Sequence, residues 1–319
     1  MMTINQLQRG IVIDCARRYC SLSSLKAVID EIPHHSGNFL QLHFSDNEGY
    51  GIASQVIGLT KDEPNVSYLT RHELREFIDY ATDRMIQVIP DFDVPAHSKY
   101  WVERYQQCYP EQTIQTDFDE TVVDYFGSES AEQAVQQMID EIASIFWQPQ
   151  FKQRMVIGAD EVPGSRTNQA AYISFINRTA DYVQRQGFRP AIWNDGVTNE
   201  GIDMLDDSID ILYWQQPEDG IEVEAFTERG RAVYNYNFYT ATFLPRYGYD
   251  DDAIKEQTAY MTTHHQLDVF CYHNNPYTKV ITTEIIGDAM TFWNEEAASL
   301  TDEAWLKQVL PLVRAFFSE

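Results

Sequence analysis

The stretch MVIGADE occupies residues 155–161 and sets the pattern for the whole chain. Its apolar start, at residues 155–157, suits a strand that is buried on both faces, as in a parallel sheet. Gly158 and Ala159 are small, and beyond them the chain can leave the strand so that Asp160 and Glu161 both reach one pocket. Comparable apolar runs recur along the sequence and alternate with longer helical patterns. This alternation is typical of strand–helix units around a parallel sheet.

Eight such runs are expected to be strands, and no low-complexity segment divides them. The expected strands are residues 10–16, 39–44, 85–91, 155–159, 191–194, 209–214, 232–237 and 290–293. Helical patterns fill the intervals, among them residues 24–32, 71–84, 131–146, 169–186 and 303–317. The alternation predicts an α/β fold of one domain, a single (β/α)8 TIM barrel over residues 1–319. A doubly wound sheet is the competing fold, but no glycine-rich phosphate loop follows the first strand.

The charge of the chain restricts its partners. Its 319 residues include 49 acidic and 23 basic side chains, which gives a formal net charge of −26. Such a surface disfavours nucleic acids and anionic membranes and favours a neutral or positive ligand. The four cysteines form no CxxC pair and have no histidine at a metal-ligand spacing. We therefore expect no metal, no other cofactor and a monomeric protein.

Polar and aromatic residues follow the expected strands, and in a TIM barrel these strand ends meet at one face. The residues are Arg17, Asp46, His97, Asp160, Glu161, Trp193, Trp214, Trp293 and Glu295. Aromatic faces ringed by carboxylates are typical of a sugar pocket. Two carboxylates acting on a glycosidic bond fit this pattern. A Schiff-base lysine at a strand end and a GxSxG nucleophile motif are both missing from the sequence.

The sequence also allows structural roles for some of these residues. The Asp-Glu pair could form a buried ion pair, and the three tryptophans could belong to the core. Asp91, Asp93 and His97 carry the carboxylate and imidazole groups that bind Mn, Fe or Zn. No second histidine stands four residues from His97, so a role in holding a carboxylic acid in position is the better interpretation.

Several motifs resemble glycoside hydrolase family 20, the β-N-acetylhexosaminidases. The most specific is IGADE at residues 157–161, which is similar to the catalytic strand of that family. It is supported by DFDVPAH at residues 91–97 and WNDG at residues 193–196. Within the family, LHFSD (42–46), NYN (235–237) and WNE (293–295) look closest to the dispersin type, which hydrolyses poly-N-acetylglucosamine. The resemblance runs from Arg9 to about Ala298.

The resemblance implies a mechanism in which the 2-acetamido oxygen of the substrate attacks the anomeric carbon, with net retention. Glu161 would then be the general acid and later the base, and Asp160 would orient the acetamido group. We expect burial to keep Glu161 protonated while Asp160 stays ionised. His97 would support Glu161, with Asp46 behind it.

The resemblance also implies how the sugar is bound. Arg17 and Glu295 would bind sugar hydroxyls, and Trp193, Trp214 and Trp293 would form the wall of the acetamido pocket. A tyrosine of the family hydrogen-bonds the acetamido oxygen, and Tyr239 is the nearest candidate in this chain. The position of this tyrosine is one departure from the family pattern. The other is Val156, which stands where the family usually has a histidine.

These expectations predict hydrolysis of β-linked N-acetylglucosamine, with the β-1,6-linked polymer of biofilm matrix as the expected substrate. One alternative is a broad exo-acting β-N-acetylhexosaminidase on glycan or chitin oligosaccharides. A further alternative is a barrel that binds carbohydrate without cleaving it, which the valine at position 156 favours. The substrate predicts a secreted or extracellular protein, whereas the start of the chain, MMTINQLQRG, has no signal-peptide pattern and leaves the cytoplasm as the alternative location.

Overall fold

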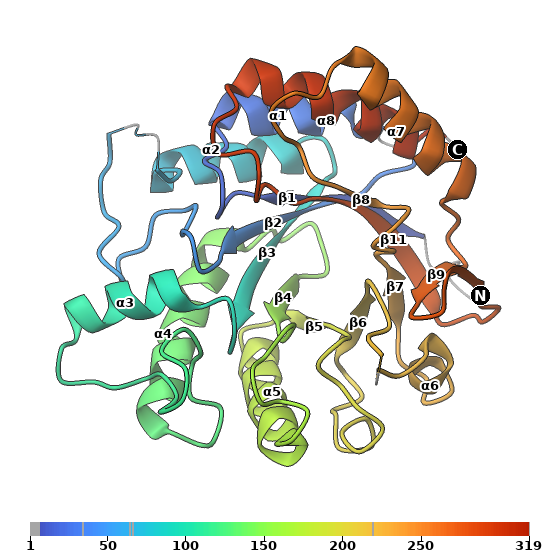
Figure 1. Cartoon of the computed structure of the whole chain (residues 1–319). Helices are drawn as coiled ribbons and strands as arrows, with labels where there is room; N and C mark the ends of the chain where they lie inside the picture. The colour runs from blue at the N-terminus through green and yellow to red at the C-terminus, as the bar shows by residue number, and fades with distance from the viewer. Residues whose placement is uncertain (1–6, 34, 64, 66, 219, 319) are drawn as a thin grey trace.

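The computed structural model describes residues 7–318, apart from His34, Pro64, Val66 and Asp219. Within these residues, eight parallel strands pair in order around a closed ring. They are β1 (Gln8–Asp14), β2 (Phe39–Ser45), β3 (Gln87–Val94), β4 (Arg154–Gly158), β5 (Arg189–Trp193), β6 (Asp210–Tyr213), β7 (Val233–Asn235) and β11 (Ile285–Phe292). β11 pairs with both β7 and β1, and the second pairing closes the ring. The predicted TIM barrel is confirmed (Figure 1).

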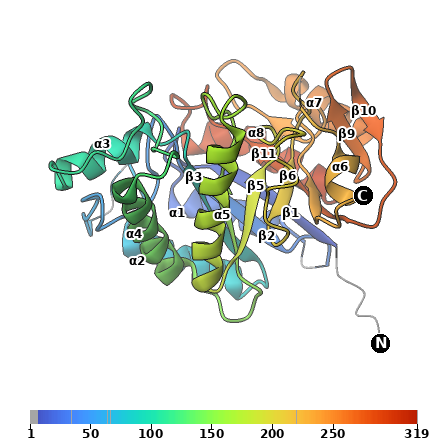
Figure 2. The same cartoon turned by 90° about the horizontal axis from the view of Figure 1, so that it is seen from below.

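Helices surround the strands on the outside of the barrel (Figures 1 and 2). They are α1 (Leu22–Glu31), α2 (Arg71–Thr82), α3 (Lys99–Cys108), α4 (Glu129–Phe146), α5 (Gln169–Arg185), α6 (Val223–Thr227), α7 (Asp251–His264) and α8 (Asp302–Phe316). α2 begins with a capping box in which Thr70 and Glu73 satisfy each other's backbone N–H groups. None of the described helices is long and apolar enough to cross a membrane.

Two apolar layers hold the barrel together. A large layer lies between strands and helices, and a smaller cluster fills the inside of the ring, where Val12, Ile89, Val156 and Leu212 are buried. At the starts of the strands, Arg154 closes the interior: its guanidinium lies 4.4 Å from the ring of Phe39. The open end of the barrel is therefore the opposite one, at the C-terminal ends of the strands.

Strand boundaries differ from expectation where buried polar residues continue a strand. β3 runs to Val94 and not only to Asp91, so Asp93 lies within the sheet and not in the loop that follows. Three further short strands were not expected. β8 (Thr242–Phe243) pairs with β11, and β9 (Val269–Tyr272) forms an antiparallel hairpin with β10 (Asn275–Lys279). β8 brings Thr242 beside Thr291 at the mouth of the barrel.

Candidate active site

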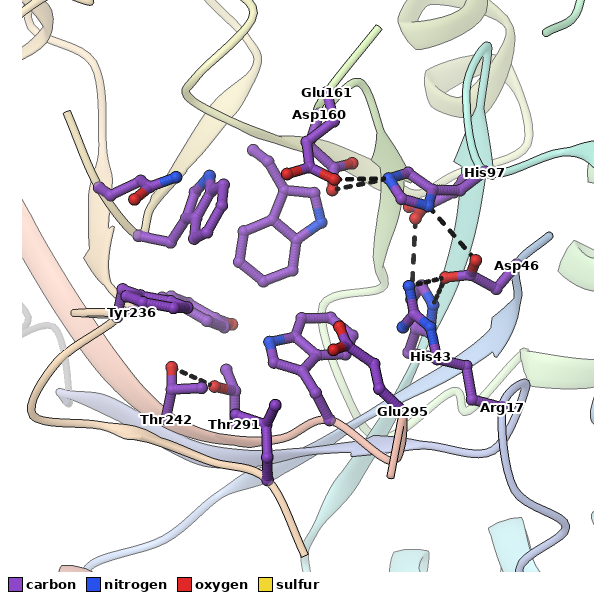
Figure 3. Close-up of a pocket in the computed structure, with 17 residues that line it drawn as sticks. Arg17, His43, Asp46, His97, Asp160, Glu161, Tyr236, Thr242, Thr291 and Glu295 are labelled. Carbon is purple, nitrogen blue, oxygen red and sulfur yellow. Dashed lines mark hydrogen bonds and ion pairs between the residues drawn. The ribbon is translucent and has the colours of Figure 1, made fainter. Parts of the chain in front are cut away.

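A pocket of about 350 Å³ opens at the C-terminal end of the barrel (Figure 3). Its lining comes from the C-terminal ends of all eight barrel strands and the segments that follow them, including the short strand β8. The residues that line it include Arg17, His43, Asp46, Asp93, His97, Asp160, Glu161, Trp193, Trp214, Gln215, Tyr236, Phe238, Thr242, Leu244, Thr291, Trp293 and Glu295. All the predicted site residues except Tyr239 are among them.

The chain bends sharply after β4, and this bend directs the two adjacent carboxylates. Gly158, Ala159 and Glu161 have positive φ angles of 67°, 78° and 48°. For a residue with a side chain, such a conformation costs on the order of 1 kcal/mol and persists only where neighbours hold it. Here the backbone N–H of Glu161 donates to Asp195 Oδ2 over 2.9 Å, and the Tyr172 hydroxyl donates to the carbonyl of Ala159 over 2.5 Å.

Gly158 has a second role, because its missing side chain makes room for Asp93. A Cβ at position 158 would lie 2.3 Å from Asp93 Oδ1, far inside van der Waals contact. The glycine in the MVIGADE stretch therefore lets a carboxylate of β3 approach the bend that carries Asp160.

His97 connects the catalytic pair to a buried aspartate. Its Nε2 lies 3.4 Å from Glu161 Oε2 and 3.7 Å from Asp160 Oδ2, and its Nδ1 lies 3.3 Å from Asp46 Oδ1 (Figure 3). Burial alone would lower the pKa of His97, but the charge of Asp160 and the contacts with Asp46 and Glu161 raise it well above the ordinary value. The imidazole is therefore held in its protonated form. This placement agrees with the predicted arrangement of Asp46 behind His97.

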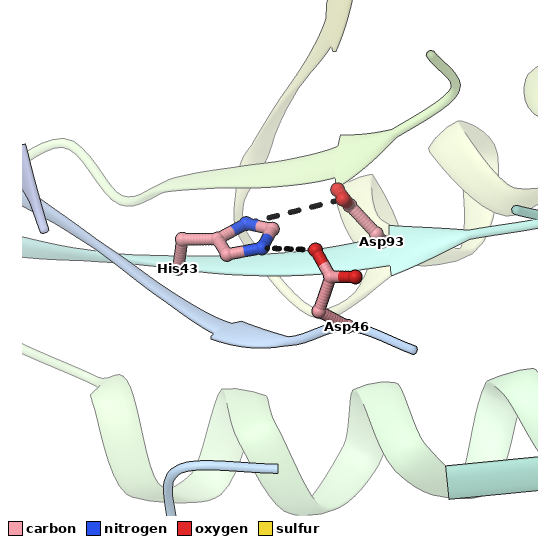
Figure 4. A group of neighbouring side chains, drawn as sticks. All are labelled: His43, Asp46 and Asp93. Atoms are coloured by element: carbon pink, nitrogen blue, oxygen red, sulfur yellow. Dashed lines mark hydrogen bonds and ion pairs between the residues drawn. The ribbon is translucent and has the colours of Figure 1, made fainter. Parts of the chain in front are cut away.

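His43 forms a second link behind the first. Its Nε2 lies 3.0 Å from Asp46 Oδ2, and its Nδ1 lies 3.9 Å from Asp93 Oδ2 (Figure 4). The same Nδ1 lies 3.2 Å from Asp91 Oδ2. Since both ring nitrogens face carboxylates, both must donate, and the ring is an imidazolium. Burial lowers the pKa of His43, but the surrounding aspartates more than offset this and raise it well above the ordinary value.

His43 and the aspartates around it also decide whether a metal site is a good alternative interpretation. Among the described residues, His43, Asp46 and Asp93 bring their potential ligand atoms within 4.8 Å of one another. A histidine ligand must offer a nitrogen without a proton, whereas both nitrogens of His43 are engaged as donors. The cluster is thus explained as a hydrogen-bonded imidazolium among carboxylates. His97, the third residue of the metal alternative, contacts Asp46, Asp160 and Glu161 instead.

The protonation order of the two carboxylates is the reverse of the expected one. Burial raises the pKa of Asp160 to about 7, although the charge of His97 acts in the opposite direction. Glu161 lies at the pocket rim with 59% of its side chain exposed, and its contact with His97 lowers its pKa. The expectation that burial keeps Glu161 protonated is therefore wrong for this structure. Solvent reaches Glu161, and of the two contacting residues His97 and Glu161 it is His97 that holds the proton.

Arg17 lies at the pocket wall with its guanidinium shared among three carboxylates. Its nitrogens lie 3.1 Å from Asp14 Oδ2, 2.7 Å from Asp46 Oδ2 and 3.4 Å from Glu48 Oε2. It also lies 5.8 Å from the ring of Trp293. Arg17 therefore compensates the buried charge of Asp46, while its role in binding hydroxyls stays a prediction. Glu295 is exposed at the rim.

Three tryptophans, Trp193, Trp214 and Trp293, line the pocket and form an aromatic wall; their contact with an acetamido group stays a prediction. The ring centroids of Trp193 and Trp293 lie 5.9 Å apart, and Trp293 also meets the ring of His43 edge-on. Trp214 is fixed by its indole N–H, which donates to Asp195 Oδ1 over 3.0 Å. Because Asp195 also accepts from the backbone of Glu161, one side chain orients both the aromatic wall and the catalytic bend.

Tyr239 is the one predicted site residue that the structure places elsewhere. Its side chain is 52% exposed and does not line the pocket, whereas the preceding residue, Phe238, does. The reason is a tight turn in which Asn237 Oδ1 accepts from the backbone N–H groups of Tyr239 and Thr240. Instead of a tyrosine hydroxyl, the pocket contains the hydroxyls of Thr242 and Thr291, which lie 2.7 Å apart.

Several pocket residues have no role predicted from the sequence. They are His43, Gln215, Tyr236, Phe238, Thr242, Leu244 and Thr291. Asp93 is predicted only as a candidate metal ligand, and Asp195, which lies outside the pocket lining, has no predicted role. The sequence carries a signal for His43 and Asp93. Gln41, His43 and Ser45 alternate with apolar residues in β2, as do Asp91 and Asp93 in β3, and such polar alternation in a buried strand marks the side that faces the site.

Comparisons with known proteins agree with this geometry. Residues 8–316 match the model of glycosyl hydrolase family 20, catalytic domain. A β-hexosaminidase of Vibrio furnissii is 28% identical over 181 residues, which are 49% of this chain and 29% of that protein. A β-hexosaminidase of Porphyromonas gingivalis is 24% identical over 67% of this chain and 30% of its own length. The chain thus spans about 30% of the length of these relatives.

Solved structures share the same fold. The crystal structure of Dispersin B superposes with a TM-score of 0.83 at 24% identity and covers 98% of both chains. A family 20 exo-β-N-acetylglucosaminidase of Vibrio harveyi, in complex with N-acetylglucosamine, superposes with a TM-score of 0.68 at 19% identity over 99% of this chain and 55% of that one. From the family match over nearly its full length, this chain belongs to glycosyl hydrolase family 20, and its barrel is the catalytic domain of that family.

Proposed function

We propose that this chain hydrolyses β-linked N-acetylglucosamine with retention, using the acetamido group of the substrate as the nucleophile. The observation that carries the proposal is the placement of Asp160 and Glu161 at one bend, with His97 in contact with both and a tryptophan-lined pocket beside them. The two carboxylates differ in environment, with 18% of the Asp160 side chain exposed against 59% for Glu161, as two different roles in one reaction require.

In the first step the acetamido oxygen attacks the anomeric carbon, and the bond from that carbon to the leaving oxygen breaks. Asp160, in its ionised form, accepts a hydrogen bond from the acetamido N–H and stabilises the positive charge of the resulting oxazolinium ion. In the second step water attacks the anomeric carbon and loses a proton to Glu161. The two inversions together give net retention.

The leaving oxygen needs one proton, and the pair of His97 and Glu161 holds it. Since His97 keeps its proton while Glu161 is the more acidic partner, we propose that Glu161 delivers a proton that His97 shares through Nε2. Asp46 and His43 hold this imidazole from behind; Arg17 pairs with Asp46, and His43 contacts Asp91.

For the substrate we propose the β-1,6-linked polymer of N-acetylglucosamine. The structural likeness to Dispersin B over the full barrel supports this choice, as do the dispersin-like stretches of the sequence. The second candidate is a broad exo-acting hexosaminidase, which is favoured by the β-hexosaminidases among its relatives.

One comparison tests both levels of the proposal. The release of phenol from an aryl β-N-acetylglucosaminide is measured beside the clearing of β-1,6-linked polymer. Hydrolysis of either substrate with a β-configured first product supports the reaction class, and no hydrolysis of either contradicts it. A preference for the polymer supports the dispersin-type substrate, whereas a strong preference for the aryl glycoside supports the broad exo-enzyme.

A further inference from the structure

A line of polar contacts runs through the inside of the barrel behind the sugar pocket. It joins, in this order, Tyr236, Gln41, Asp91, His43, Asp46, His97 and Glu161. Its two ends, Tyr236 and Glu161, both line the sugar pocket (Figure 3). The part from His43 to Glu161 holds the protons of the site, and Gln41 lies where this part meets the interior of the barrel.

Gln41 has a fixed orientation in this line. Its side chain is fully buried in β2, and its Nε2 donates to Asp91 Oδ2 over 2.7 Å. Its Oε1 accepts from the hydroxyl of Tyr236 over 2.8 Å. Because the carboxylate of Asp91 can only accept, the amide nitrogen must face Asp91, and the Tyr236 hydroxyl must then donate. The direction of both hydrogen bonds is thereby determined.

Asp91 has few other donors. The Nδ1 of His43 donates to the same oxygen, Oδ2, over 3.2 Å. The other oxygen, Oδ1, is buried and has no hydrogen-bond partner among the described residues. On the neighbouring strand β4, the residue in register with Asp91 is Val156, which offers no side-chain donor. Within the described part of the chain, Gln41 is therefore the one neutral side chain that donates to Asp91.

His43 depends on Asp91 as a counter-charge. The charged groups that face His43 are Asp46, from the segment after β2, and Asp91 and Asp93, from β3. Asp93 is the most distant of the three, at 3.9 Å. Burial and the charges of Asp160 and Asp91 raise the pKa of Asp93 well above its ordinary value, so Asp93 is held neutral. The charge of His43 is thus balanced by Asp46 and Asp91.

We propose that Gln41 is a positioning residue of the active site, which holds Asp91 as an acceptor and so keeps His43 protonated at both ring nitrogens; this rests on the proposed function. With both nitrogens protonated, His43 donates to Oδ2 of Asp46 over 3.0 Å, and Oδ1 of Asp46 is left to face His97. Gln41 thereby acts on Glu161 through His97, without touching the substrate.

Loss of the Gln41 donor should move protons toward the inside of the barrel. A buried carboxylate with one donor fewer keeps its charge less readily, so Asp91 should take the Nδ1 proton of His43. A neutral imidazole is a weaker donor than an imidazolium. Asp46 should then attract the Nδ1 proton of His97 more strongly, and less of the charge of His97 is available to Glu161.

Two substitutions at position 41 separate the hydrogen bond from packing. Gln41→Leu keeps a side chain of similar size that can neither donate nor accept. Gln41→Glu keeps the shape, and its carboxyl can donate to Asp91 and accept from Tyr236 only while it is protonated. At higher pH the introduced carboxyl ionises and two carboxylates face each other. Gln308→Glu is the matched control, because Gln308 is 5% exposed and its amide bonds to the backbone of Arg246, outside the barrel interior.

Kinetics on an aryl β-N-acetylglucosaminide give the first readout. In Gln41→Leu we expect kcat to fall by roughly 10- to 100-fold, while KM changes less than about twofold because Gln41 does not line the pocket. In Gln41→Glu the ratio of kcat to that of the unmodified protein should be close to one at pH 6 and fall about tenfold by pH 9. The control should give the same ratio at both pH values. A kcat in Gln41→Leu within about twofold of the unmodified value, or a ratio in Gln41→Glu that does not change with pH, would overturn the role of Gln41.

Long-range ¹H–¹⁵N spectra of the imidazole rings give a second readout that does not depend on activity, with His43→Gln as the means of assignment. At pH 8, His43 of the unmodified protein should show two protonated nitrogens, and in Gln41→Leu it should show one. An imidazolium that persists at His43 in Gln41→Leu would contradict the proposal. If the unmodified protein cleaves no β-N-acetylglucosaminide, the proposed function has failed before any variant is made, and the spectra still decide whether Gln41 holds the charge of His43.

Discussion

The Nε2 atom of His97 lies 3.4 Å from Oε2 of Glu161, and the backbone of His97 has a positive φ of 51° to place it there. This contact sets the protonation of the site. It raises the pKa of the imidazole and lowers that of the carboxyl, so the proton rests on His97. The same imidazole reduces the cost of ionising the buried Asp160. His97 thereby links the proton donor to the group that stabilises the developing positive charge.

Removal of either catalytic carboxylate should abolish most of the activity. Glu161→Gln cannot carry a proton to the leaving oxygen, and we expect kcat to fall by about 10²- to 10⁴-fold or more. Asp160→Asn leaves the oxazolinium charge without its counterion and should be slowed to a similar extent. Steady-state kinetics on an aryl β-N-acetylglucosaminide, with circular dichroism as the check of folding, measure both. Turnover close to that of the unmodified protein in either variant would contradict the assigned role.

The pH dependence of kcat/KM should be bell-shaped. Ionisation of Asp160 should give the acidic limb, and because its pKa is raised to about 7, activity should increase as the pH passes through that value. Loss of the proton shared by His97 and Glu161 gives the alkaline limb, which lies above the ordinary pKa of histidine because that of His97 is raised.

The variant His97→Gln tests this assignment. Without the imidazolium, the pKa of Asp160 should move up, which shifts the acidic limb to higher pH. The alkaline limb should move down, because the remaining proton carrier is Glu161 alone. The bell should therefore narrow and its maximum should fall. Limbs that stay in place with only a lower maximum would show that His97 has a purely structural role.

Asp160 should reduce the stability of the protein in exchange for activity. Its folded-state pKa is raised to about 7, so folding favours the protonated form. At a pH below its unfolded-state pKa, the carboxyl leaves the free energy of unfolding the same as a neutral side chain would. It destabilises the protein increasingly as the pH rises toward 7, and the effect is constant above.

Asp160→Asn should consequently increase the free energy of unfolding by on the order of 1 to 4 kcal/mol above pH 7, and by almost nothing near pH 4. Urea denaturation of both proteins at pH 4, 6 and 8 gives the comparison. A gain of equal size at all three values would point to altered packing and not to the carboxyl's ionisation.

Asp195 should support catalysis without touching the reacting atoms. Its two oxygens accept from the backbone N–H of Glu161 and from the indole N–H of Trp214, over 2.9 and 3.0 Å. In Asp195→Asn one of the two acceptors becomes a donor, so either the bend or the tryptophan must move. Since small misplacements are costly, we expect kcat/KM to fall by roughly 10- to 100-fold.

Asp252→Asn is the matched control for Asp195, because its carboxylate is exposed and contacts only Lys255 among the described contacts. It should leave kcat/KM unchanged. The intrinsic fluorescence of Asp195→Asn reports whether the environment of Trp214 has changed. Full activity in this variant would show that the bend is held by other contacts, such as that of Tyr172.

Much of the architecture followed from local sequence. The run MVI predicts a buried strand wherever it stands, and a small pair followed by two acids predicts a strand end with polar groups. The alternation of eight expected strands with helical segments was sufficient to predict the barrel, since parallel strands with helical connections have few ways to close. Asp160, Glu161, His97 and the three tryptophans were found for the same reason: each lies at the C-terminal end of a strand or within three residues of it.

The protonation of the site was decided by tertiary structure. The pKa of Asp160 depends on burial and on His97, which the fold brings from another strand end. The inward position of Phe238 and the outward one of Tyr239 depend on a turn closed by Asn237. The sequence by itself determined, to within a few residues, where the eight barrel strands end, because long apolar runs and the polar residues that follow them are visible locally. Only the tertiary structure determined which of them carry protons and which face the sugar, because charge interactions and side-chain directions depend on neighbours that are distant in the chain.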